Sequence, residues 1–227
     1  MTDVIPVTVI PVTSPLNTIA LVAEFQALFD KEEPIGWCIP DQRTCLLRLQ
    51  LITEELSELE HALCCRDLVE VLDALTDLQY VIDGTIISCG MSKFMWSRIK
   101  ERQDFNRVLR VEPPRYPDQP LLFIAQFSRS LANLTEAFSD MNASRVATHL
   151  EKLNWDLECI YADCGMIGVR EDAFREVHRS NMSKLGPDGK PVTDGAGRVV
   201  KGPGYSRPDL TKFIPAPGES FTQEVSN

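Results

Sequence analysis

The sequence predicts an all-α fold, and three observations support that expectation. Apolar residues recur at intervals of three and four along most of the chain between residues 17 and 183, which is the spacing of one face of a helix. Asp residues precede several of these stretches and Gly or Pro residues follow them, as they do at helix ends. We expect no strand before residue 186. The chain should therefore fold as a helical bundle.

The composition excludes several classes of protein. The chain has 227 residues, and its 44% hydrophobic content is enough for a substantial core. The net charge of −10 argues against a general DNA- or RNA-binding surface, which would need a basic stripe. No apolar run reaches about 18 residues and no secretory signal is recognisable, so we expect no membrane contact and a cytoplasmic location. The seven cysteines contain no C-x-x-C pair, which favours buried thiols over zinc ligands or disulfides.

Proline and glycine divide the chain into five parts. Residues 1–17 carry three prolines and should form an extended arm. A metal-binding helical unit over 18–112 and a second helical unit over 121–185 are joined by a Pro-rich linker over 113–120. Residues 186–227 are rich in Gly and Pro, so they form either a loop over a ligand or a mobile end. Helices are expected over 17–30, 41–64, 67–88, 92–108, 121–142, 144–164 and 172–183.

The two helical units share an internal similarity. A gapless alignment of residues 89–91 with residues 164–166, both Cys-Gly-Met, pairs apolar positions with apolar positions upstream: Leu78 with Leu153, Leu75 with Leu150, and Val71 with Val146. In the same alignment three acids lose their charge or meet a cation: Glu70, Asp73 and Asp77 oppose Arg145, Thr148 and Lys152. A fused tandem in which only the first unit binds metal is one interpretation, and chance similarity between two amphipathic helices is the other.

Six acidic residues stand out on two consecutive helices. Residues three, four and seven apart share a helical face, so Glu54, Glu55 and Glu58 can converge, and so can Glu70, Asp73 and Asp77. They interrupt or flank the apolar stripes, which include Leu47, Leu51, Ile52 and Leu59 on the first helix and Leu68, Val71, Leu72 and Leu75 on the second. Carboxylates at a core border repel one another unless a cation is bound. Oxygen ligands alone suit Mg²⁺, with Mn²⁺ as a substitute. The alternative is a solvated acidic helix face.

Several ordered blocks resemble one known superfamily. Glu54-Glu55-Leu-Ser-Glu58 followed by Glu70-Val-Leu-Asp73 resembles the E-E-x-x-E, spacer, E-x-x-D signature of the MazG and phosphoribosyl-ATP pyrophosphohydrolase superfamily, the all-α NTP pyrophosphatases. Residues 75–81 resemble its A-D-L-x-Y-V segment. Residues 174–184 resemble the F-x-E-V-x-R-S-N-M-S-K segment of a MazG-like, dUTPase-like branch common in phages and bacteria. The similarity covers residues 20–91 and 165–212.

The resemblance implies an Mg²⁺-dependent hydrolase that converts a nucleoside triphosphate into the monophosphate and pyrophosphate. It implies metal ligands among Glu55, Glu58, Glu70, Asp73 and Asp77. Either Glu70 with Asp73 or Asp73 with Asp77 supplies the pair from the second helix. Catalytic roles fall to Glu54 and Glu55, with Glu54 orienting or deprotonating the attacking water. The expected substrate contacts are Arg48, Tyr80, Arg179, Asn181, Lys184 and Lys201, with Phe25, Phe29 or Trp37 as further candidates to stack on the base.

The resemblance also implies a biological setting. Relatives adjust deoxynucleotide pools, and dGTP and dUTP are the first substrates to try; a phage-encoded member would act in the cytoplasm of its bacterial host. One helical hairpin cannot bury its own apolar face, so we expect a homo-oligomer, either a dimer or a tetramer. The competing hypothesis is a non-enzymatic nucleotide-binding or scaffold protein.

Overall fold

The structure of the chain is a computed structural model that describes residues 15–29, 33–109, 120–186, 190, 192 and 201–215, without the side chains of 104–109, 120 and 121. Within these ranges there are seven α-helices and two short 3₁₀ helices, and no strand. The expected all-α class is confirmed. No helix in the described part of the chain is both long enough and apolar enough to cross a lipid bilayer.

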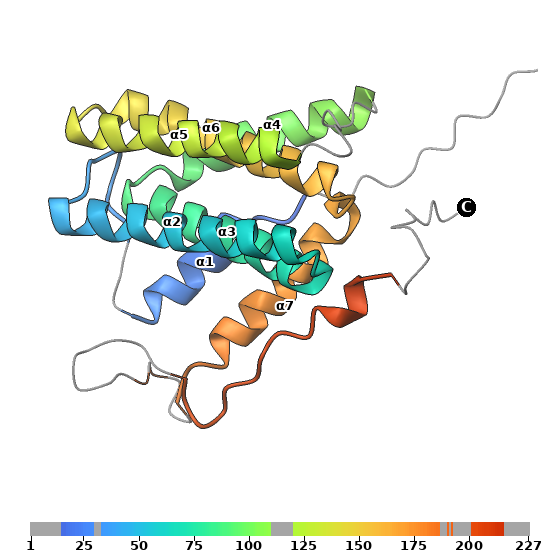
Figure 1. Ribbon diagram of the computed structural model, residues 1–227. Coiled ribbons are helices and arrows are strands. Elements are labelled where there is room, and N and C mark those ends of the chain that lie inside the picture. Colours follow the sequence, from blue (N-terminus) through green and yellow to red (C-terminus); the bar gives the residue numbers. More distant parts are fainter. Residues whose placement is uncertain are drawn as a thin grey trace, which may run out of the picture.

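The helices form two layers with a shared core (Figure 1). Helices α2 and α3 pack against each other in one layer, and α5 and α6 do the same in the other. Helices α1 and α7 lie on the far side of α3, while α4 packs against α6. The bounds are α1 Thr18–Ala27, α2 Gln42–Cys65, α3 Leu68–Ser88, α4 Ser92–Leu109, α5 Pro120–Ser139, α6 Ala143–Asp163, η1 Ile167–Val169, α7 Arg170–Met182 and η2 Thr211–Phe213.

Local sequence explains where the two acidic helices begin. The Asp41 side chain accepts a 2.9 Å hydrogen bond from the backbone N–H of Thr44 and so caps α2. Asp67 caps α3 by accepting from the N–H groups of Val69 and Glu70. Between them Arg66 adopts a left-handed backbone conformation with φ of 56°, which ends α2 and turns the chain back. Both caps were predicted from the sequence.

The turn between α5 and α6 repeats the turn between α2 and α3. Met141 also has a positive φ, of 51°, and lies 75 residues after Arg66 (66 to 141). The N–H of Asn142 bonds the carbonyl of Ala137 at 3.0 Å, just as that of Asp67 bonds Ala62 at 3.2 Å. The helix ends correspond in the same register, since Gly90 and Gly165 both have positive φ, of 65° and 74°. The two hairpins therefore share one backbone pattern.

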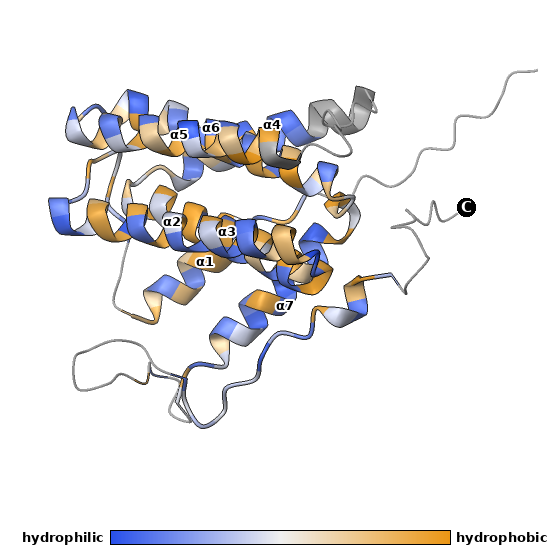
Figure 2. Ribbon diagram, in the orientation of Figure 1, coloured by the Kyte–Doolittle hydropathy of each residue, from blue (hydrophilic) through white to orange (hydrophobic). Residues whose placement is uncertain are grey.

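Helix α3 lies at the centre of the core. Leu72, Leu75 and Leu78 are fully buried, and each such side chain contributes about 1.5–3 kcal/mol by leaving water. The helices carry hydrophobic and hydrophilic residues on different faces (Figure 2). Two expectations for the apolar stripes are wrong, because Leu47 is 44% exposed and Leu68 is 43% exposed. The buried positions of α2 follow Cys45, Arg48, Ile52, Leu56 and Leu59, and Leu47 lies one residue, about 100°, off that face.

The terminal segments are described only in part. Residues 1–14 of the expected arm and 113–119 of the expected linker lie outside the described residues, while Pro120 begins α5. At the end of the arm, the N–H of Leu16 donates to Glu171 Oε1 at 3.2 Å and so contacts the start of α7. Residues 201–215, which we call the C-terminal segment, run back along α7 (Figure 1).

Candidate active site

A cavity of about 470 Å³ lies between α1, α2, α3, α7 and the C-terminal segment. Seven of the twelve residues predicted for the site line it: Arg48, Glu55, Asp77, Tyr80, Asn181, Lys184 and Lys201. They come from three parts of the chain that are far apart in the sequence. The other lining residues are Phe25, Gln26, Phe29, Leu51 and Val81. The cavity thus combines carboxylates, cations and an apolar wall.

The carboxylates at this cavity are partly buried beside one another. Burial, followed by the charges of Asp77 and Glu58, raises the pKa of Glu55 to about 8. Burial likewise raises the pKa of Asp77 to about 7, with Asp73 as the largest charge contribution. The pKa of Asp73 is also raised, by burial and by Glu70, and its Oδ1 atom is buried without a hydrogen-bond partner. This cluster resists ionisation without a positive charge.

The donor chemistry of this cluster fits a hard divalent cation such as Mg²⁺. Its candidate ligands are all carboxylate oxygens, and the orphaned oxygen of Asp73 has free lone pairs. In the conformation described, no three His, Cys, Asp or Glu side chains within the described ranges are grouped closely enough to hold an ion.

The second-helix acids do not all lie at the same place. The charges of Asp77 and Asp73 both raise the pKa of Glu55. Glu70 is exposed, and its charge raises the pKa of Asp73. The electrostatics thus favour Asp73 with Asp77 over Glu70 with Asp73. Glu54 is exposed at the border of the cluster, where its Oε1 accepts a 2.7 Å hydrogen bond from Gln50.

Lysines from the far end of the chain face these acids. Lys184 Nζ donates to Asn181 Oδ1 at 2.7 Å, and its charge lowers the pKa of both Asp73 and Asp77. Lys201 lines the same cavity, with its Nζ 4.7 Å from the centre of the Tyr205 ring. A complex of a triphosphate with a metal ion requires cations for the phosphate oxygens and carboxylates for the metal ion.

Arg48 reaches the cavity across α3. Its side chain is buried, and its Nε donates to Ser88 Oγ at 2.9 Å. A Cβ atom at Gly84 would lie 2.9 Å from Arg48 Nη1 and 2.8 Å from Gln26 Nε2. Gly84 therefore leaves the space through which the guanidinium passes.

The apolar wall is aromatic. Tyr80 stacks on Phe174 with ring centres 5.6 Å apart and meets Phe25 edge-on at 5.8 Å. Phe25 in turn packs on Phe29 at 4.7 Å. Trp37, another aromatic candidate, is 44% exposed, packs on Phe94 and does not line the cavity. The base-stacking candidates that remain are Phe25, Phe29 and Tyr80.

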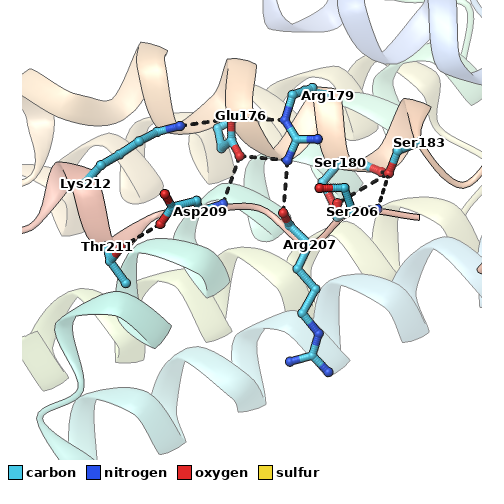
Figure 3. Close-up of polar contacts among 9 residues, drawn as sticks. All are labelled: Glu176, Arg179, Ser180, Ser183, Ser206, Arg207, Asp209, Thr211 and Lys212. Atoms are coloured by element: carbon cyan, nitrogen blue, oxygen red, sulfur yellow. Dashed lines mark hydrogen bonds and ion pairs between the residues drawn. The ribbon is translucent and has the colours of Figure 1, made fainter. Parts of the chain in front are cut away.

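Arg179, a predicted substrate contact, does not line the cavity. Its guanidinium pairs with Glu176 at 2.8 Å and donates to the carbonyl of Arg207 at 3.0 Å (Figure 3). Glu176 also accepts from the N–H of Asp209 and pairs with Lys212. The hydrogen bond from Arg179 is the largest cause that lowers the pKa of Glu176, to about 2. Arg179 therefore fastens the C-terminal segment to α7.

The same segment passes close to Lys184. A Cβ atom at Gly202 would lie 3.1 Å from the carbonyl oxygen of Lys184 and 3.2 Å from that of Leu185. Gly202 permits this approach, which holds the neighbouring Lys201 beside the end of α7. The sequence had left open whether residues after 186 cover a ligand, and the described part of this tail supplies Lys201 to the cavity.

Sequence reasoning missed two residues that matter for this geometry. Gln26 is buried and lines the cavity, and a polar residue between the apolar positions of the first helix was the available signal. Glu176 belongs to the motif of residues 174–184, but the motif does not indicate its contacts. It bonds Arg179 on α7 and both Asp209 and Lys212 of the C-terminal segment.

Comparisons with known proteins support the family. A family model described as phosphoribosyl-ATP pyrophosphohydrolase matches residues 22–101, which include the six candidate acids Glu54, Glu55, Glu58, Glu70, Asp73 and Asp77. An uncharacterized protein, L479, of Acanthamoeba polyphaga mimivirus is 28% identical over 165 residues, or 63% of this chain. The chain spans 59% of the length of that relative. No solved structure matches. Residues 22–101 therefore match the phosphoribosyl-ATP pyrophosphohydrolase domain, which is of the MazG-like all-α NTP pyrophosphatase type.

Proposed function

We propose that the protein is a metal-dependent pyrophosphohydrolase that cleaves a nucleoside triphosphate between its α- and β-phosphates. The observation that carries this proposal is the cavity itself, where Glu55 and Asp77 face Lys184. An acidic side for a cation and a basic side for phosphate are what a metal–triphosphate complex needs. The family match supports this reaction type, because it covers the acidic helices.

In this proposal Glu55, Glu58, Asp73 and Asp77 hold Mg²⁺, for which Mn²⁺ can substitute. When bound, the ion neutralises phosphate charge and acidifies a water molecule. The raised pKa values of Glu55 and Asp77 mean that these carboxyls release protons as the ion binds. Glu70, exposed at the border, has at most an outer role.

The protein's own side chains position the phosphates. Lys184, oriented by Asn181, and Lys201 donate to phosphate oxygens on the side away from the acids. Arg48 gives one N–H to Ser88 and keeps further guanidinium donors for the substrate. Phe25, Phe29 and Tyr80 form the apolar wall against which a base can stack.

The chemical step is an addition of water across one bond. The water oxygen attacks the α-phosphorus, the bond from that phosphorus to the bridging oxygen breaks, and pyrophosphate leaves with the bridging oxygen. The proton that the water loses passes to the carboxylate of Glu54, which is exposed and free to exchange it with solvent.

A nucleotide panel tests the proposal. Purified protein should release pyrophosphate from at least one deoxynucleoside triphosphate in Mg²⁺ and from none in EDTA, with dGTP and dUTP tried first. Glu55→Gln should remove this activity. Glu60→Gln is the matched control, because Glu60 is an exposed acid of the same helix that does not line the cavity. If a folded sample releases no pyrophosphate from any nucleotide, the scaffold alternative stands and the proposal is wrong.

We further propose a homo-oligomer, a dimer or a tetramer. Exposed Leu46 and Leu47 on α2 are apolar surface that a partner can cover. Light scattering should give a mass of at least twice the 25.5 kDa of one chain, and a mass equal to one chain contradicts the proposal.

A further inference from the structure

A second cavity, of about 710 Å³, lies on the other layer of the bundle. Helices α5 and α6 form most of its wall, and α4 contributes Arg102. Its lining residues are otherwise Gln126, Arg129, Ser130, Asn133, Thr148, His149, Glu151, Lys152 and Trp155. None of them lines the carboxylate cavity.

The second cavity occupies the place in its hairpin that the carboxylates occupy in theirs. The 75-residue register fixed by Arg66 with Met141 and Gly90 with Gly165 extends through both hairpins. In that register five acids have non-acidic counterparts: Glu54, Glu55, Glu58, Asp73 and Asp77 correspond to Arg129, Ser130, Asn133, Thr148 and Lys152. All five counterparts line the second cavity. The five acidic positions of one hairpin thus correspond to two cations and three neutral hydrogen-bonding groups in the other.

Buried acids hold two of the cavity's cations in place. Lys152 pairs with Asp156, whose side chain is fully buried and also accepts from Ser130 at 2.7 Å. Arg102 Nη2 pairs with Glu158 at 3.0 Å, and Glu158 is 8% exposed while Arg102 is 19% exposed. The buried acids therefore hold the side chains of Lys152 and Arg102 in one orientation. Less side-chain entropy is then lost when a ligand binds these cations.

The cations keep donors for a ligand. An ammonium has three N–H donors, so the Lys152 Nζ keeps two after it pairs with Asp156. Arg129 is exposed and makes no side-chain hydrogen bond or ion pair with the described residues. Lys152 and Arg102 are paired with Asp156 and Glu158, and Glu151, the acid of the lining, pairs with Arg98 at 3.2 Å. Arg129 therefore gives the cavity one positive charge that the described residues do not compensate, in a chain of net charge −10.

The size and the aromatic residue suit a nucleotide-sized ligand. Cavities of roughly 300–1,000 Å³ are typical of small-molecule sites. Trp155 stands 75 residues after Tyr80 (80 to 155), one of three aromatic residues that line the carboxylate cavity. The Arg102 guanidinium lies 5.2 Å from the centre of the Trp155 ring. His149 stays neutral at pH 7, because burial and Arg145 lower its pKa, so it can donate or accept a hydrogen bond.

We propose that this second cavity binds the phosphate chain of a small phosphorylated molecule directly, without a metal ion. Arg129, Lys152 and Arg102 contact the phosphate oxygens, and Ser130, Asn133 and Thr148 are within the same lining as neutral partners. The phosphate chain can belong to inorganic pyrophosphate or to a nucleoside triphosphate. The proposal is independent of catalysis at the carboxylate cavity.

Binding in EDTA tests it, because EDTA removes the cation on which the carboxylate cavity depends. Calorimetry and Trp155 fluorescence should detect pyrophosphate or a deoxynucleoside triphosphate with a Kd of about 10–100 µM, weakening as salt rises. Whichever of pyrophosphate and the deoxynucleoside triphosphate has the lower Kd identifies the source of the phosphate chain. Trp155→Phe removes the fluorescence signal from this cavity while calorimetry still reports the affinity.

Variants assign the binding to this cavity. Arg129→Gln, which breaks no contact in the described residues, should weaken binding in EDTA about tenfold. Arg175→Gln, the loss of an equal charge on α7, and Glu55→Gln should leave it unchanged. The proposal is overturned if neither probe binds below millimolar concentration in EDTA. It is equally overturned if Glu55→Gln, rather than Arg129→Gln, abolishes the binding, whatever the pyrophosphatase assay gives.

Discussion

The Glu176 carboxylate accepts a 2.9 Å hydrogen bond from the backbone N–H of Asp209, and this contact ties the C-terminal segment to α7. Arg179 pairs with the same carboxylate and also holds the carbonyl of Arg207 (Figure 3). The segment that is fastened in this way carries Lys201 at the cavity. The contact therefore links a structural ion pair to the proposed phosphate site.

The first prediction concerns this link. Glu176→Gln should raise KM for the nucleotide about three- to tenfold, since one or two charge-assisted hydrogen bonds that hold the segment are weakened. The value of kcat should change less, because the metal-binding acids are not touched. Steady-state kinetics measures both parameters. Asp172→Asn removes an exposed acid from the same helix and is the control; an equal KM change in both variants contradicts the positioning role.

The second prediction separates stability from activity. In the absence of metal, Glu55→Gln should stabilise the protein by about 1 kcal/mol at pH 8.5, because it removes a partly buried charge beside other acids. Urea unfolding in EDTA measures this difference. The same variant should lose pyrophosphate release in Mg²⁺. A variant that is less stable in EDTA than the parent protein shows that Glu55 is not electrostatically strained.

The third prediction is a pH dependence that comes from Asp83. Burial raises its pKa to about 7, from an ordinary value of 3.8, so between these values the folded protein holds a proton that the unfolded chain has released. Stability must then fall as pH rises from about 4 to 7, by at most about 1.4 kcal/mol per pH unit for this group.

Asp83→Asn isolates that contribution. Thermal unfolding in EDTA from pH 5 to pH 8 should show a shallower decline for the variant than for the parent protein, because the asparagine does not titrate. Gln79 can still donate its 2.8 Å hydrogen bond to the Oδ1 of the asparagine. Identical slopes for the two proteins contradict the burial of an ionisable Asp83.

The fourth prediction uses the close approach at Gly84. Gly84→Ala places a methyl group against the ends of two side chains, Arg48 and Gln26, which can move away. The helical preference for alanine, about 1 kcal/mol, offsets the lost contacts, so thermal stability should change little. The displaced guanidinium should raise KM as Arg48→Met does. A fully active Gly84→Ala with a low-activity Arg48→Met contradicts the idea that this glycine positions Arg48.

Much of the fold was predictable because it depends on local chemistry. The caps at Asp41 and Asp67 and the glycine at position 90 each act on their own helix end, so the helix bounds follow from the sequence to within a few residues. Which helices pack together depends on contacts between distant residues. The packing of α7 on α3 and of α4 on α6 could not be read from periodicity.

The candidate site was predictable only where motif position and helical face agree. Asn181 and Lys184 are three residues apart on one face of α7 and its end, and both line the cavity. Arg179 belongs to the same motif but lies two residues before Asn181, about 200° around the helix, so it faces the C-terminal segment. The motif alone does not give this difference in direction between Arg179 and Asn181.

The identity of the products tests the central claim most directly. A single deoxynucleoside triphosphate that is incubated with the protein and Mg²⁺ should yield the monophosphate and pyrophosphate in equal amounts, measured by chromatography. Asp77→Asn should yield neither product while its circular dichroism remains helical, and Glu60→Gln should match the parent protein. Formation of the diphosphate and inorganic phosphate, or full activity of Asp77→Asn, would contradict cleavage of the α–β bond at the cavity of Glu55 and Asp77.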